Sequence, residues 1–393
     1  MLSTLLFAFV GCYVSLKFLG WFLSIGSGKP KRIPKPDISL RFAAVIPAHN
    51  EEESIAGTVQ SILDAGIPPE DVYVLLNGCT DKTAEEVKKC RVKICGEHRH
   101  VEPVTETNHI RGKEETIKFA IHGLGLFWKY THVCFFDADT LIDREYFRVT
   151  KERIRSDPSI DIVCGRPRSL PQNWLTAHRA VQYSTFHRLH KSAQEKFSGI
   201  LVVPGCAGTY STRSLRKIDW SSDTRIGDMD ATIQANNMKM KIAFEPRAIV
   251  KTQDPSTLRG YTNQLYWRWN RGLWMNMRKH GVLWKGPLSM MNWDCRWMFF
   301  DQFLPFIFLI AVWQLRLPYH FWSAIGGYSA IIAVEVLVCA IAEKRWDILK
   351  YFPVFPLLRI YDTLLFVSSM WNILLKKEKK AAWISPQRYQ VKA

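Results

Sequence analysis

Two aspartates separated by one residue follow an apolar run near the middle of this 393-residue chain. Residues 133–136 read as a buried strand, and Asp137 and Asp139 come directly after it. Residues two apart on an extended backbone point the same way, so both carboxylates can aim at one ion. The pattern indicates a metal site, and an Asx turn that ends a strand is the competing interpretation.

Polar residues also follow two earlier predicted strands, at 43–46 and 72–76. His49 and Glu51 follow the first strand, directly after Pro47 and Ala48, and Asn77 follows the second. Strands alternate with predicted helices from residues 50 and 83, and a further strand is expected at 161–164. This alternation predicts an α/β fold with a mixed, mainly parallel sheet, whose chemistry lies at the carboxyl ends of the strands.

The segment 202–210 is rich in small and turn-forming residues, among them Gly205, Cys206 and Gly208. Such a backbone lets a bulky ligand approach closely. Asp228 opens another predicted helix further along the chain. We therefore expect a second group of functional residues on this later part of the sheet domain.

The composition of the chain excludes disorder, since 47% of residues are hydrophobic and 13% are aromatic. The net charge of +17 comes from basic residues that cluster beside apolar stretches, which is typical of the cytoplasmic flanks of membrane proteins. No aromatic-basic platform for nucleic acid is evident outside residues 261–277. The nine cysteines show no paired zinc spacing, and we predict that they are reduced.

Four apolar stretches are long enough to be considered as membrane crossings, at 1–25, 298–315, 321–341 and 351–375. We interpret the first as an uncleaved anchor rather than a signal peptide, and the basic linker after it places the next domain in the cytoplasm. The last stretch contains Arg359 and Asp362, which could neutralise each other. Four crossings would leave the Lys-rich tail outside, so the side of the carboxyl terminus stays open.

Taken in order, these motifs resemble the inverting nucleotide-sugar glycosyltransferases with a GT-A fold. The likeness is strongest to the membrane-embedded processive group that makes cellulose, chitin, hyaluronan and poly-N-acetylglucosamine. It covers roughly residues 42–278, with a looser echo at 383–388. It implies five segments: a transmembrane helix (1–27), a GT-A domain (38–255), amphipathic interfacial helices (256–297), transmembrane helices (298–377) and a basic tail (378–393).

The resemblance implies a binding site for a nucleotide sugar with Mg²⁺ or Mn²⁺. In the resembling enzymes the first acid of the metal motif lies nearer the nucleotide and the second nearer the metal, which we carry over to Asp137 and Asp139. The base is expected against Pro47, Ala48 and His49, with Glu51 and Asn77 nearby, and Lys113 matches a position that meets the donor. The family usually has an acid near position 77, and His49 could equally be a core or capping histidine.

For the general base of inverting transfer we choose Asp228. It aligns with the acid of the family's Glu-Asp or Asp-Asp motif, although Gly227 replaces the usual preceding acid. Asp228 could instead cap a helix. Asp230 is either a cap or a supporting partner.

A third motif precedes the later apolar stretches. Arg268 and Trp269 match the end of the family's Gln-x-x-Arg-Trp motif, but Gln264 stands four residues before Arg268 instead of three. Arg268 is expected to offset the charge of the leaving diphosphate. Trp269 is expected to pack beneath the acceptor sugar, which would also contact Gln264, Gly205, Cys206 and Gly208. In the family this motif accompanies retention of the growing chain, so the shifted glutamine concerns processivity and not transfer itself. The alternative is that the segment is an interfacial helix with no role in the site.

The sequence thus predicts a membrane-bound, metal-dependent inverting glycosyltransferase. It would transfer a hexose or N-acetylhexosamine from a UDP-linked donor to a growing β-linked polysaccharide at the cytoplasmic face of a plasma or inner membrane. Its partners would be the donor, a glycan or lipid acceptor, membrane lipids and an accessory membrane subunit, and no nucleic acid. A non-processive transferase that adds one sugar to a lipid, and an inert nucleotide- or glycan-binding membrane subunit, are the alternatives.

Overall fold

The computed structural model describes residues 39–94, 97–107, 112–170, 172–197, 199–221, 223–282 and 318–375, with isolated residues between 11 and 22 and between 296 and 313. These residues form two compact units. The sheet unit lies within Gly28–Leu170 and Gly199–Pro255, and the helical unit within Met1–Ser27, Pro171–Ser198 and Ser256–Glu378. The helical unit therefore includes a segment that interrupts the sheet unit in the sequence.

The sheet unit contains an eight-stranded sheet in the order β5-β2-β1-β6-β9-β8-β10-β7. The pairs β1–β2, β1–β6, β2–β5 and β8–β10 are parallel, and the pairs that involve β9 or β7 are antiparallel. The strands are β1 Phe42–Ala48, β2 Val72–Asn77, β5 Val104–Thr107, β6 His132–Phe135, β7 Thr140–Ile142, β8 Ile162–Ser169, β9 Gly208–Ser211 and β10 Ile242–Thr252. Strands β3 (Arg91–Ile94) and β4 (Glu97–His100) form a separate hairpin. A mixed, mainly parallel sheet is therefore confirmed.

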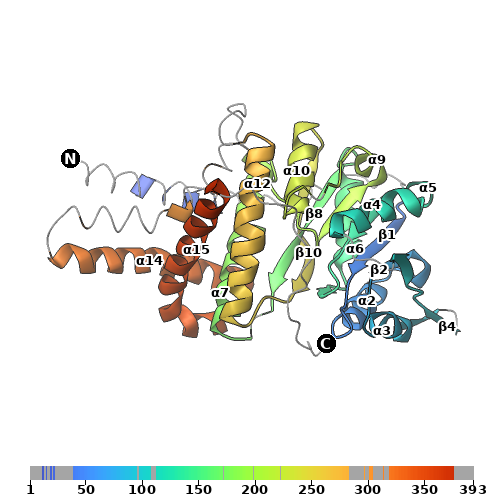
Figure 1. Ribbon diagram of the computed structural model, residues 1–393, viewed down its shortest axis with the longest axis horizontal. Helices are drawn as coiled ribbons and strands as arrows, with labels where there is room; N and C mark the ends of the chain where they lie inside the picture. The colour runs from blue at the N-terminus through green and yellow to red at the C-terminus, as the bar shows by residue number, and fades with distance from the viewer. Residues whose placement is uncertain are drawn as a thin grey trace. The chain divides into compact units, whose positions relative to one another are not determined.

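Helices cover both faces of this sheet (Figure 1). Alternate residues of β1 explain this, because Ala44 and Ile46 belong to one apolar cluster, and Ala43 and Val45 to the other. The first cluster includes residues of α2 (Ile55–Asp64), α3 (Thr83–Lys89) and α6 (Tyr146–Ser156). The second includes residues of α4 (Lys113–Gly123), α5 (Leu126–Lys129), α9 (Thr212–Leu215) and α10 (Gly227–Asn237). Every residue of β1 is buried, as expected for a central strand covered twice.

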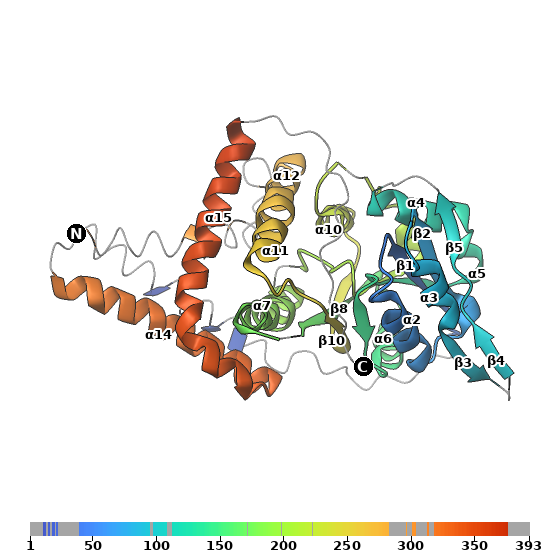
Figure 2. The ribbon, with the colours of Figure 1, turned by 60° about the horizontal axis from the view of Figure 1, so that its bottom comes forward.

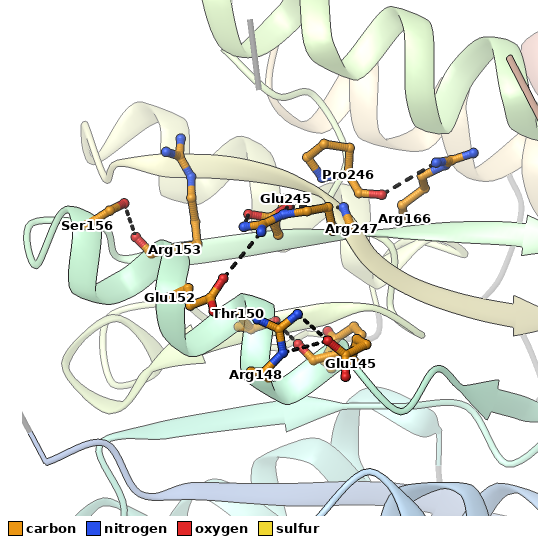
Figure 3. Close-up of polar contacts among 11 residues, drawn as sticks. Glu145, Arg148, Thr150, Glu152, Arg153, Ser156, Arg166, Glu245, Pro246 and Arg247 are labelled. Atoms are coloured by element: carbon orange, nitrogen blue, oxygen red, sulfur yellow. Dashed lines mark hydrogen bonds and ion pairs between the residues drawn. The ribbon is translucent and has the colours of Figure 1, made fainter. Parts of the chain in front are cut away.

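Strand β10 is bent by a bulge that lies between Phe244 and Ile249. Inside the bulge, Arg247 donates to the buried Glu245 from Nε at 2.9 Å, and to Glu152 of α6 at 3.3 Å (Figure 3). Beyond the bulge, Thr252 of β10 pairs with Thr140 of β7. The bulge therefore lets one strand run beside β8 and also hold the segment that follows Asp139.

The helical unit is formed by α7 (Trp174–Ser184), η2 (Thr185–His190), α8 (Lys191–Phe197), α11 (Leu258–Thr262), η3 (Asn263–Asn270), α12 (Arg271–Lys279), α14 (Pro318–Glu343), η4 (Trp346–Val354) and α15 (Phe355–Leu375). Segments η2 and η3 are π-helical and η4 is a 3₁₀ helix. Helix α7 begins with a capping box, in which the Asn173 side chain accepts from the backbone of Thr176 and the Thr176 hydroxyl accepts from the backbone of Asn173.

Two stretches of the helical unit, Ile325–Glu343 and Trp346–Ile373, are long and apolar enough to cross a membrane (Figure 2, orange and red). They correspond to the predicted crossings at 321–341 and 351–375. The predicted crossings at 1–25 and 298–315, and the tail after 378, lie almost wholly outside the described residues. The two apolar helices are consistent with a membrane anchor.

Arg359 and Asp362 of α15 have separate partners. Asp362 accepts hydrogen bonds from Tyr261 at 2.6 Å and Gln182 at 2.8 Å, and it lies 3.0 Å from Nε2 of His178. The guanidinium of Arg359 lies 3.7 Å from carboxylate oxygens of Asp301 and Glu335. Arg359 and Asp362 were expected to neutralise each other. Instead, each pairs with residues outside α15, which the sequence of this helix alone could not identify.

A buried histidine at the start of β6 should make the stability of the protein depend on pH. Burial, with a smaller contribution from the positive charge of Arg213, lowers the pKa of His132 to about 4. An unfolded histidine takes up its proton near pH 6.5. Stability should therefore be lost as the pH falls from about 6.5, with the loss complete below about 4, on the order of 3 kcal/mol from this group.

The His132→Phe variant should remove this contribution, because a phenylalanine ring of similar size carries no titrating nitrogen. Denaturant unfolding of the wild-type and variant proteins at pH 7.5, 6 and 4.5 measures the effect. The free energy of unfolding of the variant should fall less steeply with acid than that of the wild type. Parallel pH curves would mean that His132 does not titrate differently in the two states.

Candidate active site

The carboxyl ends of β1 and β2 are joined by polar contacts. Nδ1 of His49 lies 2.7 Å from the backbone carbonyl of Asn77, and the Asn77 amide donates to the hydroxyl of Thr116 at 3.1 Å. Because a carbonyl only accepts, Nδ1 carries the proton, and a neutral ring presents Nε2 as an acceptor. Asn77 is fully buried. Its side chain thus faces α4, and its backbone orients His49.

The turn after β1 is held by the turn after β2. Asn50 adopts a left-handed backbone conformation with φ of 53°, and its side chain accepts from the backbone of Thr80 at 2.8 Å. The buried Glu51 donates from its backbone to the hydroxyl of Thr83 at 2.9 Å, and its carboxylate accepts from Ser54 at 3.0 Å. Pro47, Ala48, His49, Glu51 and Asn77 therefore lie together at one edge of the sheet, as their positions in the sequence predict.

Strand β6 leads directly into the two aspartates. The backbone of Thr140 donates to the carbonyl of Asp137 at 3.2 Å, which closes a turn between β6 and β7. The side chain of Asp137 is one-third exposed and forms an ion pair with Lys113, the first residue of α4. Asp139 is buried. The two carboxylates thus differ in environment although they share one turn.

Asp228 meets the same region from α10. Its Oδ2 accepts from the backbone of Gly205 at 3.0 Å, and its Oδ1 accepts from the backbone of Met229 at 2.9 Å. A methyl group added at Gly205 would lie 3.2 Å from Nζ of Lys113 and 3.6 Å from Oδ2 of Asp228. Gly205 therefore lies between the cation of α4 and the carboxylate of α10, and a larger residue would intrude on both.

The thiol of Cys206 is surrounded by these charges. Burial raises the pKa of Cys206 well above its usual range; the negative charges of Asp137, Asp139 and Asp228 raise it further, and Lys113 opposes them. Both its burial and the neighbouring carboxylates therefore favour the protonated thiol. Gly208, the first residue of β9, packs against Tyr210, and a methyl group there would lie 2.7 Å from that ring. Gly208 thus serves close packing of the sheet.

The chemistry of the donor set fits a hard divalent cation. Asp137 and Asp139 offer carboxylate oxygens, which Mg²⁺ and Mn²⁺ prefer, and two protein carboxylates leave positions for phosphate oxygens. Among the described residues, no group of three or more His, Cys, Asp or Glu side chains is arranged as a closed metal cage. The Lys113 ammonium that now pairs with Asp137 provides a further cation for an anionic ligand.

Gln264, Arg268 and Trp269 belong to the helical unit and lie on η3. Arg268 and Trp269 are exposed, and Gln264 is half-buried. A π-helical turn contains one more residue than an α-helical turn, since its hydrogen bonds join residues i and i+5. Residues four apart lie about one turn apart in an α-helix and also in a π-helix, so Gln264 and Arg268 lie near one face of η3. The neighbouring Arg271 stacks over Trp267, with 4.0 Å between the guanidinium carbon and the ring centroid.

Thr83, Thr116 and Glu114 also contact this region, and the sequence did not single them out. Thr83 and Thr116 hold the turns that carry Glu51 and Asn77. Glu114 lies against Gly227, the residue before Asp228. The only signals in the sequence are the adjacency of Glu114 to Lys113 and a glycine at the start of a helix. Neither signal identifies a spatial partner.

The profile of the family described as glycosyltransferase-like family 2 matches residues 40–272. A poly-β-1,6-N-acetyl-D-glucosamine synthase of Staphylococcus epidermidis is 23% identical over 230 residues, which are 58% of this chain and 53% of that protein. The probable glycosyltransferase YdaM of Bacillus subtilis is 22% identical over 386 residues, 91% of this chain and 88% of that protein.

A solved structure shares the fold. It is the mannosyltransferase PcManGT of Pyrobaculum calidifontis in complex with GDP-Man and Mn²⁺, with a TM-score of 0.58 and 16% identity, covering 96% of this chain and all of that one. The chain spans about half the length of the synthases that it matches, 53% in the S. epidermidis protein.

Proposed function

Because the chain belongs to the glycosyltransferase-like family 2, we propose that it is a membrane-bound inverting enzyme that transfers a hexose or N-acetylhexosamine from a nucleotide sugar to a growing β-linked polysaccharide. The observation that carries this proposal is the meeting of Asp137, Lys113 and Asp228 around Gly205, beside the buried Asp139. This arrangement offers a cation clamp, a phosphate partner and a base within one site.

Asp228 is the base in the proposed reaction. It accepts the proton of an acceptor hydroxyl while that oxygen forms a bond to the anomeric carbon of the donor sugar. The bond from the anomeric carbon to the phosphate oxygen breaks, and its electron pair leaves on the nucleoside diphosphate. Attack opposite the leaving group inverts the anomeric configuration. The backbone amides of Gly205 and Met229 hold the carboxylate in place, and so fix the direction from which it takes the proton.

The donor diphosphate would lie beside Asp137, Asp139 and Lys113. A divalent cation, when bound by the two aspartates, neutralises phosphate charge that grows as the glycosidic bond breaks. Lys113 would stabilise the same negative charge directly, because its ammonium can bind a phosphate oxygen in place of the Asp137 carboxylate. The base of the nucleotide would lie against Pro47, Ala48 and His49. There, His49 offers Nε2 as an acceptor, and Asn77 and Glu51 stabilise the turns.

The acceptor is proposed to approach Asp228 along Gly205 and Cys206, whereas Gly208, also expected there, serves the packing of β9. Arg268, Trp269 and Gln264 are assigned to the acceptor and the leaving group by their motif alone. A polymer product is favoured by the likeness to a synthase of poly-β-1,6-N-acetyl-D-glucosamine. The UDP-linked donor is proposed from the resemblance of the motifs alone. The apolar helices α14 and α15 favour action at a membrane. The cytoplasmic side of the sheet unit is proposed from the basic linker that precedes it in the sequence. The proposed partners of the protein also include membrane lipids and an accessory membrane subunit.

A panel of radiolabelled UDP- and GDP-sugars, incubated with purified membranes that contain the protein and Mg²⁺ or Mn²⁺, tests this function. We expect label from one UDP-hexose or UDP-N-acetylhexosamine to enter a long β-linked product. Membranes with the Asp228→Asn variant are the control. A product of one sugar on a lipid would support the non-processive alternative, and the absence of transfer from every donor would support an inert binding subunit.

A further inference from the structure

The first turn of α4 is packed against the first turn of α10. A methyl group added at Gly227 would lie 2.4 Å from Oε1 of Glu114, 2.7 Å from its Cγ and 2.9 Å from its Cδ. The close approach involves the whole outer part of the glutamate side chain. A residue with a Cβ at position 227 would therefore force the Glu114 side chain out of this position.

Two adjacent residues of α4 therefore reach different parts of the site. Lys113 pairs with Asp137 after β6, and Glu114 lies on Gly227 at the start of α10. Asp228 follows Gly227 directly and lies in the same first turn. A carboxylate at the amino-terminal end of a helix is stabilised by the helix dipole and by amides that lack helical acceptors. Glu114 is thus placed to hold the turn that presents Asp228.

We propose that Glu114 is a positioning residue for Asp228. Its carboxylate, packed on Gly227, holds the first turn of α10 where the Asp228 side chain meets Gly205 and the acceptor hydroxyl. This inference rests on the proposed role of Asp228 in transfer. It adds that the orientation of the base depends on a carboxylate from another helix, and that Gly227 is present because that carboxylate occupies the space beside it.

Kinetics of four variants test this dependence: Glu114→Ala, Glu114→Gln, Gly227→Ala and the double variant Glu114→Ala with Gly227→Ala. Each single change should lower kcat about tenfold while KM for the donor stays nearly constant, since the donor contacts are made elsewhere. The double variant should be no slower than either single alanine variant, because each single change already removes the contact between Glu114 and Gly227. Glu114→Gln preserves the size of the side chain and so isolates the role of its charge.

Moving the carboxylate from position 114 to position 227 should restore the lost activity. Glu114→Ala combined with Gly227→Glu fills the vacated space from α10 and should recover most of the lost kcat. Glu115→Ala, which changes the next acid of the same turn, is the matched control and should leave kcat and KM unchanged. An unchanged kcat in Glu114→Ala, or an equal loss from Gly227→Ala in both backgrounds, would overturn the proposal.

Thermal unfolding of the same variants measures the contact without catalysis. Gly227→Ala should lower the unfolding midpoint in the wild-type background and leave it unchanged when Glu114 is already alanine. Equal shifts in the two backgrounds would also overturn the proposal. If this coupling is present but the wild-type protein transfers no sugar, the failure lies with the proposed function and not with the contact between Glu114 and Gly227.

Discussion

The Asp228→Asn variant is expected to lose about 10²- to 10⁴-fold in kcat, the usual contribution of a general base. The amide is nearly isosteric with the carboxylate, and its oxygen can still accept from one of the two backbone amides that now bind Asp228, those of Gly205 and Met229, so the first turn of α10 should keep most of its shape. What it cannot do is take the proton of the acceptor hydroxyl. The initial rate of transfer from the donor identified by the panel measures the effect.

Nucleotide binding separates this loss of chemistry from a loss of structure. The dissociation constant for the nucleoside diphosphate should change by less than about threefold, because Asp228 does not meet the diphosphate in the proposed mechanism. Asp219→Asn is the matched control, since this exposed acid pairs only loosely with Lys118, at 3.5 Å, and should retain full activity. Undiminished turnover in Asp228→Asn would remove Asp228 as the base.

The Asp139→Asn variant is expected to bind Mn²⁺ in the presence of nucleoside diphosphate at least about tenfold more weakly, and to lose about 10²-fold or more in kcat. The buried carboxylate is the firmer of the two candidate ligands, because Asp137 is shared with Lys113. Replacing one anionic oxygen with an amide weakens a hard-cation site. Paramagnetic resonance of Mn²⁺ titrated into the protein with nucleoside diphosphate and no acceptor measures binding directly.

Activity at saturating Mn²⁺ completes this test, because a ligand variant should recover part of its rate as the ion concentration rises. Asp64→Asn, an exposed acid at the end of α2, is the control and should bind Mn²⁺ like the wild type. Wild-type affinity for Mn²⁺ in Asp139→Asn would exclude this residue as a ligand. Full activity of the wild type after chelation would exclude metal dependence as a whole.

The α/β fold of GT-A type could be predicted from the sequence, and the family match and the shared fold confirm it. The signals were local ones. Buried strands such as β1 and β6 are apolar along their length, and polar residues follow each strand at the point where parallel strands end together. The grouping of His49 with Asn77 could be predicted because both follow neighbouring parallel strands.

The type of helix that carries the Arg-Trp motif could not be predicted from the sequence. Gln264 stands one residue further from Arg268 than the motif expects, and on a helix both spacings place the two side chains on one face. Segment η3 is π-helical, and the two residues lie about one turn apart on it. A sequence period of 3.6 residues describes α-helices, so it cannot reveal a turn that holds an additional residue.

What the sequence by itself determined was therefore a set of acids and the kind of element that carries each, namely Asp137 and Asp139 after a buried strand and Asp228 at the start of a helix. Only the tertiary structure decided that Lys113 pairs with Asp137, that Asp228 is held by Gly205, and that Glu114 packs on Gly227. The physical reason is that periodicity reports which face of an element is buried. It does not report which side chain of a distant element fills the space opposite, and that is settled by packing.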